Sequence, residues 1–219
     1  MPDFDYQWAN LPSHHIEYQP ARIEELLAHV RLDREFFSGR PCLDSGCGNG
    51  RWTWAMMQLG ASVTSFDVSP DAVAACRRVN PSAYVCDLLS LEPNEAWDFV
   101  LCWGVLHHTR DPREGFRRVA SQVRPGGTLH VMLYHRDTQT PYEEGRRLWP
   151  TLTHEQRMAL CDRKVAELGG DLHGWWDAFN PTYNWSYTEG EVRRWFKEEG
   201  FGQIILTAKY NINMRGVRS

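Results

Sequence analysis

The chain has 219 residues, a formal net charge of −4 and an apolar share of 42%. This composition excludes wholesale disorder, and the length is enough for one domain with a sizeable core. Apolar runs are too short to cross a bilayer, and the first residues lack the features of a signal peptide. We therefore expect a cytoplasmic protein with no membrane partner. The acidic balance disfavours a nucleic-acid partner, because binding to phosphates needs a basic surface.

The six cysteines are spread along the chain and form no CxxC pair. Reduced thiols in a cytosolic protein are the simple interpretation, and neither a disulfide framework nor a metal site is expected.

The N-terminal 37 residues divide into two predicted parts. Residues 1–20 are aromatic and polar and predict an irregular arm. Residues 20–37 predict a helix, since Pro20 suits a first turn and apolar side chains recur at helical spacing from Ile23 to Val30.

Short apolar runs alternate with helical patterns from residue 40 to residue 134. Strands are predicted over 41–45, 62–67, 83–86, 97–103 and 128–134. Helices are predicted over 51–59, 69–78 and 111–123, and a turn over 125–127. Strands that are apolar on both faces predict a parallel sheet covered by helices on both sides.

The alternation stops at residue 135 and resumes near residue 189. Residues 135–190 contain a predicted helix over 153–168 and an irregular aromatic segment over 173–187. This stretch is too long for a structureless loop and predicts an inserted cap. A helix over 189–199, a strand over 201–210 and an antiparallel strand near the sheet edge complete the pattern. The fold class is α/β, with a Rossmann-like, seven-stranded and mostly parallel sheet.

A glycine-rich turn lies between the first predicted strand and the helix that follows it. In LDSGCGNG (43–50), the glycines permit a tight turn and a close ligand approach. The dinucleotide pattern GxGxxG is not met, because the third glycine comes one residue early and Arg51 follows it. Asp67, at the end of the second strand, could accept the ribose hydroxyls of a nucleoside. Asp87, at the end of the third strand, could meet an adenine amine.

Five segments together resemble the class I S-adenosylmethionine-dependent methyltransferases. They are LDSGCGNG (43–50), SFDVS (65–69), CDLLSL (86–91), WDFVLCWGVLHHTRDP (97–112) and VRPGGTLHV (123–131). They occur in the family's order and at its spacing, over about residues 40–134. The resemblance implies S-adenosylmethionine as cofactor, S-adenosylhomocysteine as product and an enzyme that transfers a methyl group. These segments are shared by many activities and say little about the acceptor.

The resemblance also implies which residues contact the cofactor. The glycine-rich turn shapes the methionine end, Asp67 binds the ribose, Asp87 flanks the adenine, and Arg22 in the arm could meet the cofactor's carboxylate. The implied set is Asp44, Gly46, Cys47, Gly48, Asn49, Gly50, Asp67, Val68, Asp87, Leu88, Trp103, Gly104, Arg22 and Tyr18. The alternatives are a purely structural turn, a helix cap at Asp67, a loop carboxylate at Asp87 and simple packing of the arm.

Histidines follow two of the predicted strands. His107 and His108 lie just past strand four, and His135 lies just past strand five. Ligands of open parallel sheets bind beyond the carboxyl ends of the strands, so one of these histidines could face the transferred methyl group. His108 is the preferred general base or acceptor-positioning residue. The alternatives are a loop cap, a core residue and an exposed strand end.

Aromatic and polar residues of the cap and the arm are the candidates for acceptor binding. They are Tyr6, Trp8, Trp176, Asp177, Tyr183, Tyr187 and Arg147. Tyrosine and tryptophan offer flat apolar surface with a polar handle. The alternatives are a satellite core that holds the cap down and a solvated helix face for Arg147.

These expectations describe one domain in four parts. They are an arm and lid helix (1–37), a cofactor-binding core (38–134), an acceptor-binding cap (135–190) and a C-terminal helix with strands (191–219). The predicted function is methyl transfer to oxygen or nitrogen of a small molecule. A methyltransferase acting on a protein or RNA, and a non-catalytic S-adenosylmethionine-binding protein, remain alternatives. Aromatics in the arm leave a homodimer open.

Overall fold

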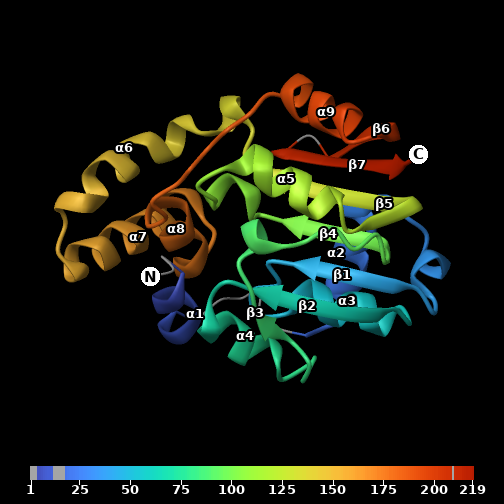
Figure 1. Ribbon diagram of the computed structural model, residues 1–219. Coiled ribbons are helices and arrows are strands. Elements are labelled where there is room, and N and C mark those ends of the chain that lie inside the picture. Colours follow the sequence, from blue (N-terminus) through green and yellow to red (C-terminus); the bar gives the residue numbers. More distant parts are fainter. Residues whose placement is uncertain (1–3, 12–17, 209) are drawn as a thin grey trace.

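A computed structural model describes residues 4–11, 18–208 and 210–219 (Figure 1). Its centre is a seven-stranded sheet with the order β3-β2-β1-β4-β5-β7-β6. The strands are β1 (Pro41–Ser45), β2 (Ser62–Asp67), β3 (Tyr84–Val85), β4 (Trp97–Trp103), β5 (Val123–Leu133), β6 (Phe201–Ala208) and β7 (Ile212–Arg218). β7 runs antiparallel to both of its neighbours, and the pairs among β1 to β5 are parallel. The predicted fold class is confirmed.

Helices cover both faces of this sheet. α2 (Ala21–Val30) and α3 (Arg51–Gln58) pack on one face, and α5 (Pro112–Ala120) and α9 (Glu189–Glu198) pack on the other. Successive strand residues point to opposite faces, so Phe99 of β4 belongs to the first core and Val100 to the second. α4 (Pro70–Cys76) lies beside α3, with Cys76 Sγ 4.0 Å from Thr53 Oγ1.

Helix boundaries follow capping chemistry. Ser69 Oγ accepts the Ala72 N–H and Asp111 Oδ1 accepts the Glu114 N–H, so α4 and α5 begin where the sequence predicts. The single helix predicted over 20–37 is wrong in its length. α2 ends at Val30, because the next residue, Arg31, has a left-handed φ of 51°, and the short 3-10 helix η2 (Arg34–Phe37) follows.

The arm is more regular than predicted. Residues 5–10 form the short helix α1 (Asp5–Asn10), and residues 1–3 and 12–17 of the predicted arm lie outside the described residues. Asp5 Oδ1 accepts a hydrogen bond from Ser69 Oγ at 2.6 Å, and the Tyr6 hydroxyl lies 3.0 Å from His154 Nε2. α1 therefore bridges the sheet domain and the cap.

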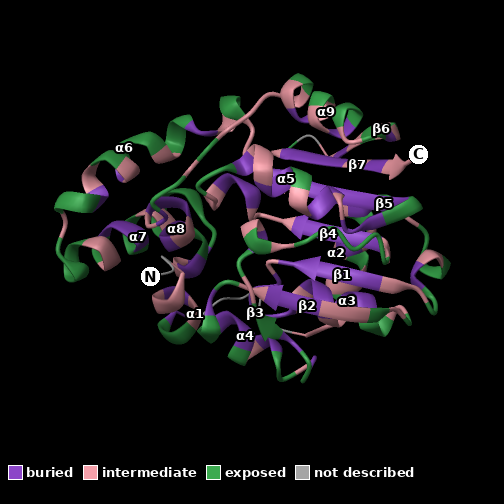
Figure 2. Cartoon of the chain, viewed as in Figure 1, coloured by how far each residue is buried: buried purple, intermediate pink, exposed green. Residues whose placement is uncertain are grey.

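The segment between β5 and α9 is a helical lobe with its own core. It contains η5 (Arg136–Thr138), α6 (Thr140–Leu148), η6 (Trp149–Thr151), α7 (His154–Leu168) and α8 (Leu172–Phe179). The aromatic segment predicted as irregular is thus partly helical, because Trp175, Trp176 and Phe179 of α8 are buried against Trp149. Figure 1 shows α6, α7 and α8 on the left, beyond the carboxyl ends of β1, β2 and β4. In Figure 2 the strands are mostly buried, whereas α6 is largely exposed.

Two other 3-10 helices, η3 (Leu88–Ser90) and η4 (Leu106–His108), follow β3 and β4 at the same end of the sheet. Within the described ranges, every helix is too short or too polar to cross a membrane.

Candidate functional site

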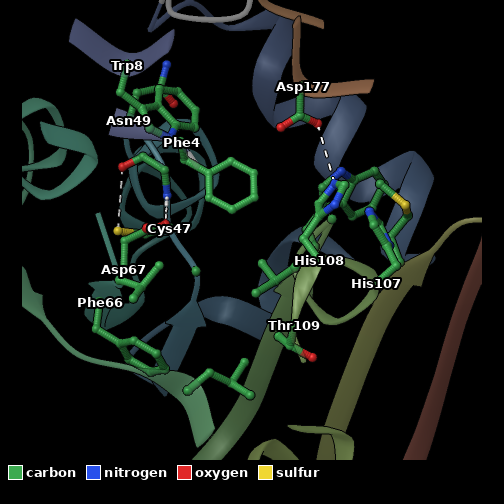
Figure 3. A pocket seen from close by; sticks show the side chains of 18 of the residues that line it. Phe4, Trp8, Cys47, Asn49, Phe66, Asp67, His107, His108, Thr109 and Asp177 are labelled. Carbon is green, nitrogen blue, oxygen red and sulfur yellow. Dashed lines mark hydrogen bonds and ion pairs between the residues drawn. The ribbon is translucent and has the colours of Figure 1, made fainter. Parts of the chain in front are cut away.

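A cavity of about 620 Å³ opens at the carboxyl ends of the parallel strands, between the glycine-rich turn, α1 and α8 (Figure 3). Its volume is in the range of small-molecule sites. Many of the predicted site residues line it together. They are Trp8, Gly46, Cys47, Gly48, Asn49, Asp67, Val68, Asp87, Leu88, Trp103, Gly104, His107, His108, Asp177 and Tyr183.

The glycine-rich turn passes closely under this cavity. Gly46 and Gly48 have φ of +79° and +54°, which side chains other than glycine rarely adopt. A Cβ on Gly46 would lie 2.3 Å from a methyl group of Val105, and a Cβ on Gly48 would lie 2.8 Å from the Trp8 ring. The turn therefore leaves no room for side chains at these two positions.

Asp67 is held by the backbone around it. Its carboxylate accepts the N–H groups of Gly48 and Ser69, both at 2.9 Å. Burial raises the pKa of Asp67 above its usual value, although these hydrogen bonds favour the charged form. Asp87 is exposed at the cavity wall, and its Oδ1 accepts the Leu89 N–H. Both carboxylates thus accept local backbone N–H groups and also line the cavity, but the N-cap of α4 is Ser69 and not Asp67, and Asp87 caps the 3-10 helix η3.

Four of the predicted cofactor residues do not line the cavity. Asp44 lies beneath the turn, where its Oδ2 accepts the Thr53 hydroxyl at 2.6 Å and burial raises its pKa to about 6. Gly50 packs against Cys76 at the start of α3. Tyr18 donates to the Asn49 carbonyl at 2.9 Å and supports the turn from outside. Arg22 is ion-paired with Glu25 on its own helix.

Arg51 is a cavity residue that the site prediction missed. It is the first residue of α3, and its guanidinium lies 4.6 Å from the Trp52 ring centroid. Burial lowers the pKa of Arg51, but an arginine stays charged. It makes no ion pair with any of the described residues. The sequence did carry a signal for this residue, because Arg51 occupies the position where the dinucleotide pattern GxGxxG would have its third glycine.

His108 and Asp177 face each other at the cavity wall (Figure 3). His108 Nδ1 lies 2.8 Å from the Tyr183 carbonyl, which can only accept, so the neutral ring carries its proton on Nδ1. His108 Nε2 is buried without a hydrogen-bond partner among the described residues and lies 3.8 Å from Asp177 Oδ2. Burial acts to raise the pKa of Asp177, but His108 and Gln7 outweigh it and hold this pKa below its usual value.

The other two candidate histidines have different surroundings. His107 accepts the Tyr134 N–H at Nδ1 and stacks on the Tyr134 ring at 3.7 Å. Burial lowers the pKa of His107 well below its usual value, so the ring is neutral. The structure does not bring His135 to the cavity. Its Nδ1 caps η5 by accepting the Asp137 N–H, as a strand-end residue would.

Four of the predicted acceptor residues are also placed elsewhere. Trp176 is buried in the cap core, with the Tyr6 ring 4.7 Å away. Tyr187 packs edge-on against Trp195 of α9. Arg147 is exposed on α6. In their place, the cavity wall includes Phe4, Met132 and Tyr134, which sequence spacing could not single out.

Comparison with known proteins identifies the family. A family model described as a methyltransferase domain matches residues 14–204. The ubiquinone biosynthesis O-methyltransferase of Xanthomonas campestris is 34% identical over 125 residues, which are 53% of this chain and 50% of that protein. The mitochondrial enzyme of the same name from Schizosaccharomyces pombe is 31% identical over 147 residues, 59% and 53% of the two chains. The chain thus spans about half the length of these curated relatives.

Solved structures share the fold at low sequence identity. The magnesium protoporphyrin IX methyltransferase of Synechocystis, solved with S-adenosylmethionine, has a TM-score of 0.58 and 17% identity, covering 90% of this chain and 78% of that one. The 1,6-didemethyltoxoflavin-N1-methyltransferase of Burkholderia thailandensis has a TM-score of 0.54 and 17% identity, covering 97% and 80%. The chain therefore belongs to the methyltransferase domain family, the class I S-adenosylmethionine-dependent methyltransferases that its motifs resemble.

Proposed function

We propose that this protein transfers a methyl group from S-adenosylmethionine to an oxygen atom of a small hydroxylated molecule. The observation that carries the proposal is His108 Nε2, which has no hydrogen-bond partner among the described residues. It is a basic nitrogen at the cavity wall, beside a carboxylate, in the same cavity as the glycine-rich turn.

The residues around the turn fit the cofactor. Asp67 fits the ribose hydroxyls, because its two carboxylate oxygens offer about four acceptor positions and Gly48 and Ser69 each donate one backbone N–H to them. Leu88 and Asp87 offer an apolar contact and an acceptor for adenine. Arg51 supplies a cation for the cofactor's carboxylate, in place of the ion-paired Arg22. When bound, S-adenosylmethionine supplies an electrophilic methyl group, and the protein supplies orientation and exclusion of water.

The acceptor side supplies the proton chemistry. A hydroxyl that donates to His108 Nε2 gives up its proton there as its oxygen becomes the nucleophile. The Nδ1–H group stays on the Tyr183 carbonyl, which fixes the ring orientation. Asp177, at 3.8 Å, stabilises the imidazolium that forms. Phe4 contacts the His108 ring edge-on at 5.4 Å and helps close this side from water.

Three further observations support a small acceptor molecule that is methylated on an oxygen atom. The cavity is roofed by side chains of α1 and α8, which suits a small molecule better than a protein or RNA. Asp177 beside His108 disfavours an anionic acceptor and favours a neutral hydroxyl. The two curated relatives described above are named O-methyltransferases.

The first test is calorimetric titration with S-adenosylhomocysteine. Asp67→Ala is expected to weaken binding at least tenfold, or about 1.4 kcal/mol. No binding to the wild type would contradict the cofactor assignment.

The second test is a screen of phenols and other alcohols with labelled S-adenosylmethionine. For an acceptor found in this way, His108→Ala is expected to lower kcat by about 10²- to 10⁴-fold, with unchanged S-adenosylhomocysteine affinity. Transfer that survives within a few-fold would rule out His108 as the base.

A further inference from the structure

The helix α1 connects the two halves of the cavity. On one side, Asp5 accepts a hydrogen bond from Ser69 Oγ, and the Ser69 N–H donates to the Asp67 carboxylate. On the other side, Gln7 enters the cap. The helix α1 thus contacts a neighbour of Asp67, the proposed ribose-binding residue, and a neighbour of His108, the proposed base.

Gln7 is a buried polar residue that the proposed chemistry does not use. Only 1% of its surface is exposed. Its Nε2 donates to Asp177 Oδ1 at 3.0 Å and to His173 Nε2 at 3.2 Å. An amide nitrogen has two hydrogens, so these two bonds use both of them. The Gln7 carbonyl Oε1 is buried with no partner among the described residues. Burying the unpaired carbonyl costs free energy, and the two hydrogen bonds donated by Nε2 offset part of that cost.

These bonds leave one oxygen of Asp177 for His108. Oδ1 is taken by Gln7, and Oδ2 is the atom 3.8 Å from His108 Nε2. The backbone of Asp177 is held in α8, where the next two residues, Ala178 and Phe179, are buried. The Asp177 carboxylate is held by the hydrogen bond from Gln7.

We propose that Gln7 is a positioning residue that holds the Asp177 carboxylate toward His108. This inference rests on the proposed function for its catalytic meaning. The orientation of the Asp177 carboxylate of α8 by the Gln7 amide of α1 can be tested without any acceptor.

The test is a ¹³C NMR titration of the Asp177 carboxyl in the full chain, assigned with Asp177→Asn. The titratable groups that interact with Asp177 are His108, His173, Arg51, Arg146 and Tyr134, and the Gln7 variants change none of them. Gln7→Leu removes both donated bonds at similar size. It is expected to move the Asp177 titration upward by about half a pH unit to one unit, since a hydrogen bond to the charged form is lost. Gln7→Glu, which places a second acceptor there, is expected to move it further.

Tyr6→Phe is the matched control. It removes a hydrogen bond between the same helix and the cap, at His154, without touching Asp177. We expect it to leave the Asp177 titration unchanged. A shift as large as that of Gln7→Leu would overturn the specific role of Gln7 and assign the effect to the seating of α1 as a whole. An unchanged titration in Gln7→Leu would also overturn the proposal.

Activity separates this proposal from the proposed function. If an acceptor is found, Gln7→Leu is expected to lower kcat about tenfold or more while the KM for S-adenosylmethionine stays within twofold. If the wild type methylates nothing and binds no S-adenosylhomocysteine, the proposed function fails. A shifted Asp177 titration would then still support the positioning role of Gln7.

Discussion

The choice between Arg51 and Arg22 as the partner of the cofactor's carboxylate can be decided with two ligands. Arg51 faces the cavity and makes no ion pair with a described residue, whereas Arg22 is ion-paired with Glu25. Arg51→Met keeps an unbranched side chain and removes the charged guanidinium, which lies 4.6 Å from the Trp52 ring centroid. A lost hydrogen bond to a charged group costs about 1.5–3 kcal/mol, or roughly 10- to 150-fold in affinity.

S-adenosylhomocysteine carries the carboxylate, and 5′-methylthioadenosine lacks the whole amino-acid portion. Calorimetry should therefore show that Arg51→Met weakens the first ligand by at least tenfold and leaves the second within about twofold. Arg22→Met is the matched control and should affect both ligands by less than about threefold. A larger effect from Arg22→Met would refute the reasoning from cavity placement and restore the assignment predicted from the sequence.

Three predictions concern stability, measured by chemical denaturation. Gly145→Ala should destabilise the protein by about 1–3 kcal/mol, because the added Cβ would lie 2.3 Å from the Phe179 ring. Gly190→Ala is the control on α9, where a Cβ meets open space, and it should stabilise the protein by up to about 1 kcal/mol. Equal effects of the two would contradict the packing of α6 on α8. Burial raises the pKa of Asp44 in the folded state from its usual 3.8 to about 6, so the folded state binds more protons than the unfolded state between these pH values. The free energy of unfolding should therefore fall by roughly 3 kcal/mol as the pH rises from about 4 to 6, and Asp44→Asn should make this fall smaller. His130 has a folded pKa of about 3, below 6.5, so it contributes the opposite slope, and His130→Phe should reduce the gain in stability between pH 4 and 6.5. Unchanged pH profiles in these two variants would show that neither group is desolvated as described.

Much of the sheet could be predicted from the sequence because its signals are local. The strands at 41–45, 62–67 and 97–103 have the predicted bounds, since short strand-forming segments that lie between glycine and proline turn signals are well delimited. The residues of the glycine-rich turn are fixed in sequence relative to the strand before it, so their position at the cavity followed from the motif.

The remaining site residues depend on tertiary contacts that spacing does not encode. α1 has too few residues to be stable alone and gains its helix from packing on α4 and α8. The sequence therefore could not place Phe4 at the cavity or Gln7 beside Asp177. Likewise, alternation could place His107 and His108 beyond β4, but only the Tyr183 carbonyl and the Tyr134 N–H distinguish their tautomers.

The two borders of the sheet bear on how this chain meets other copies of itself. β3 is only two residues long, and β6 is paired to β7 with two register shifts and has a left-handed residue at Gln203. Straight, long border strands expose unsatisfied N–H and C=O groups that recruit further strands, whereas short or bulged ones do not. This chain is thus guarded at both borders against intermolecular strand addition, so that a concentrated solution should resist fibrillar association.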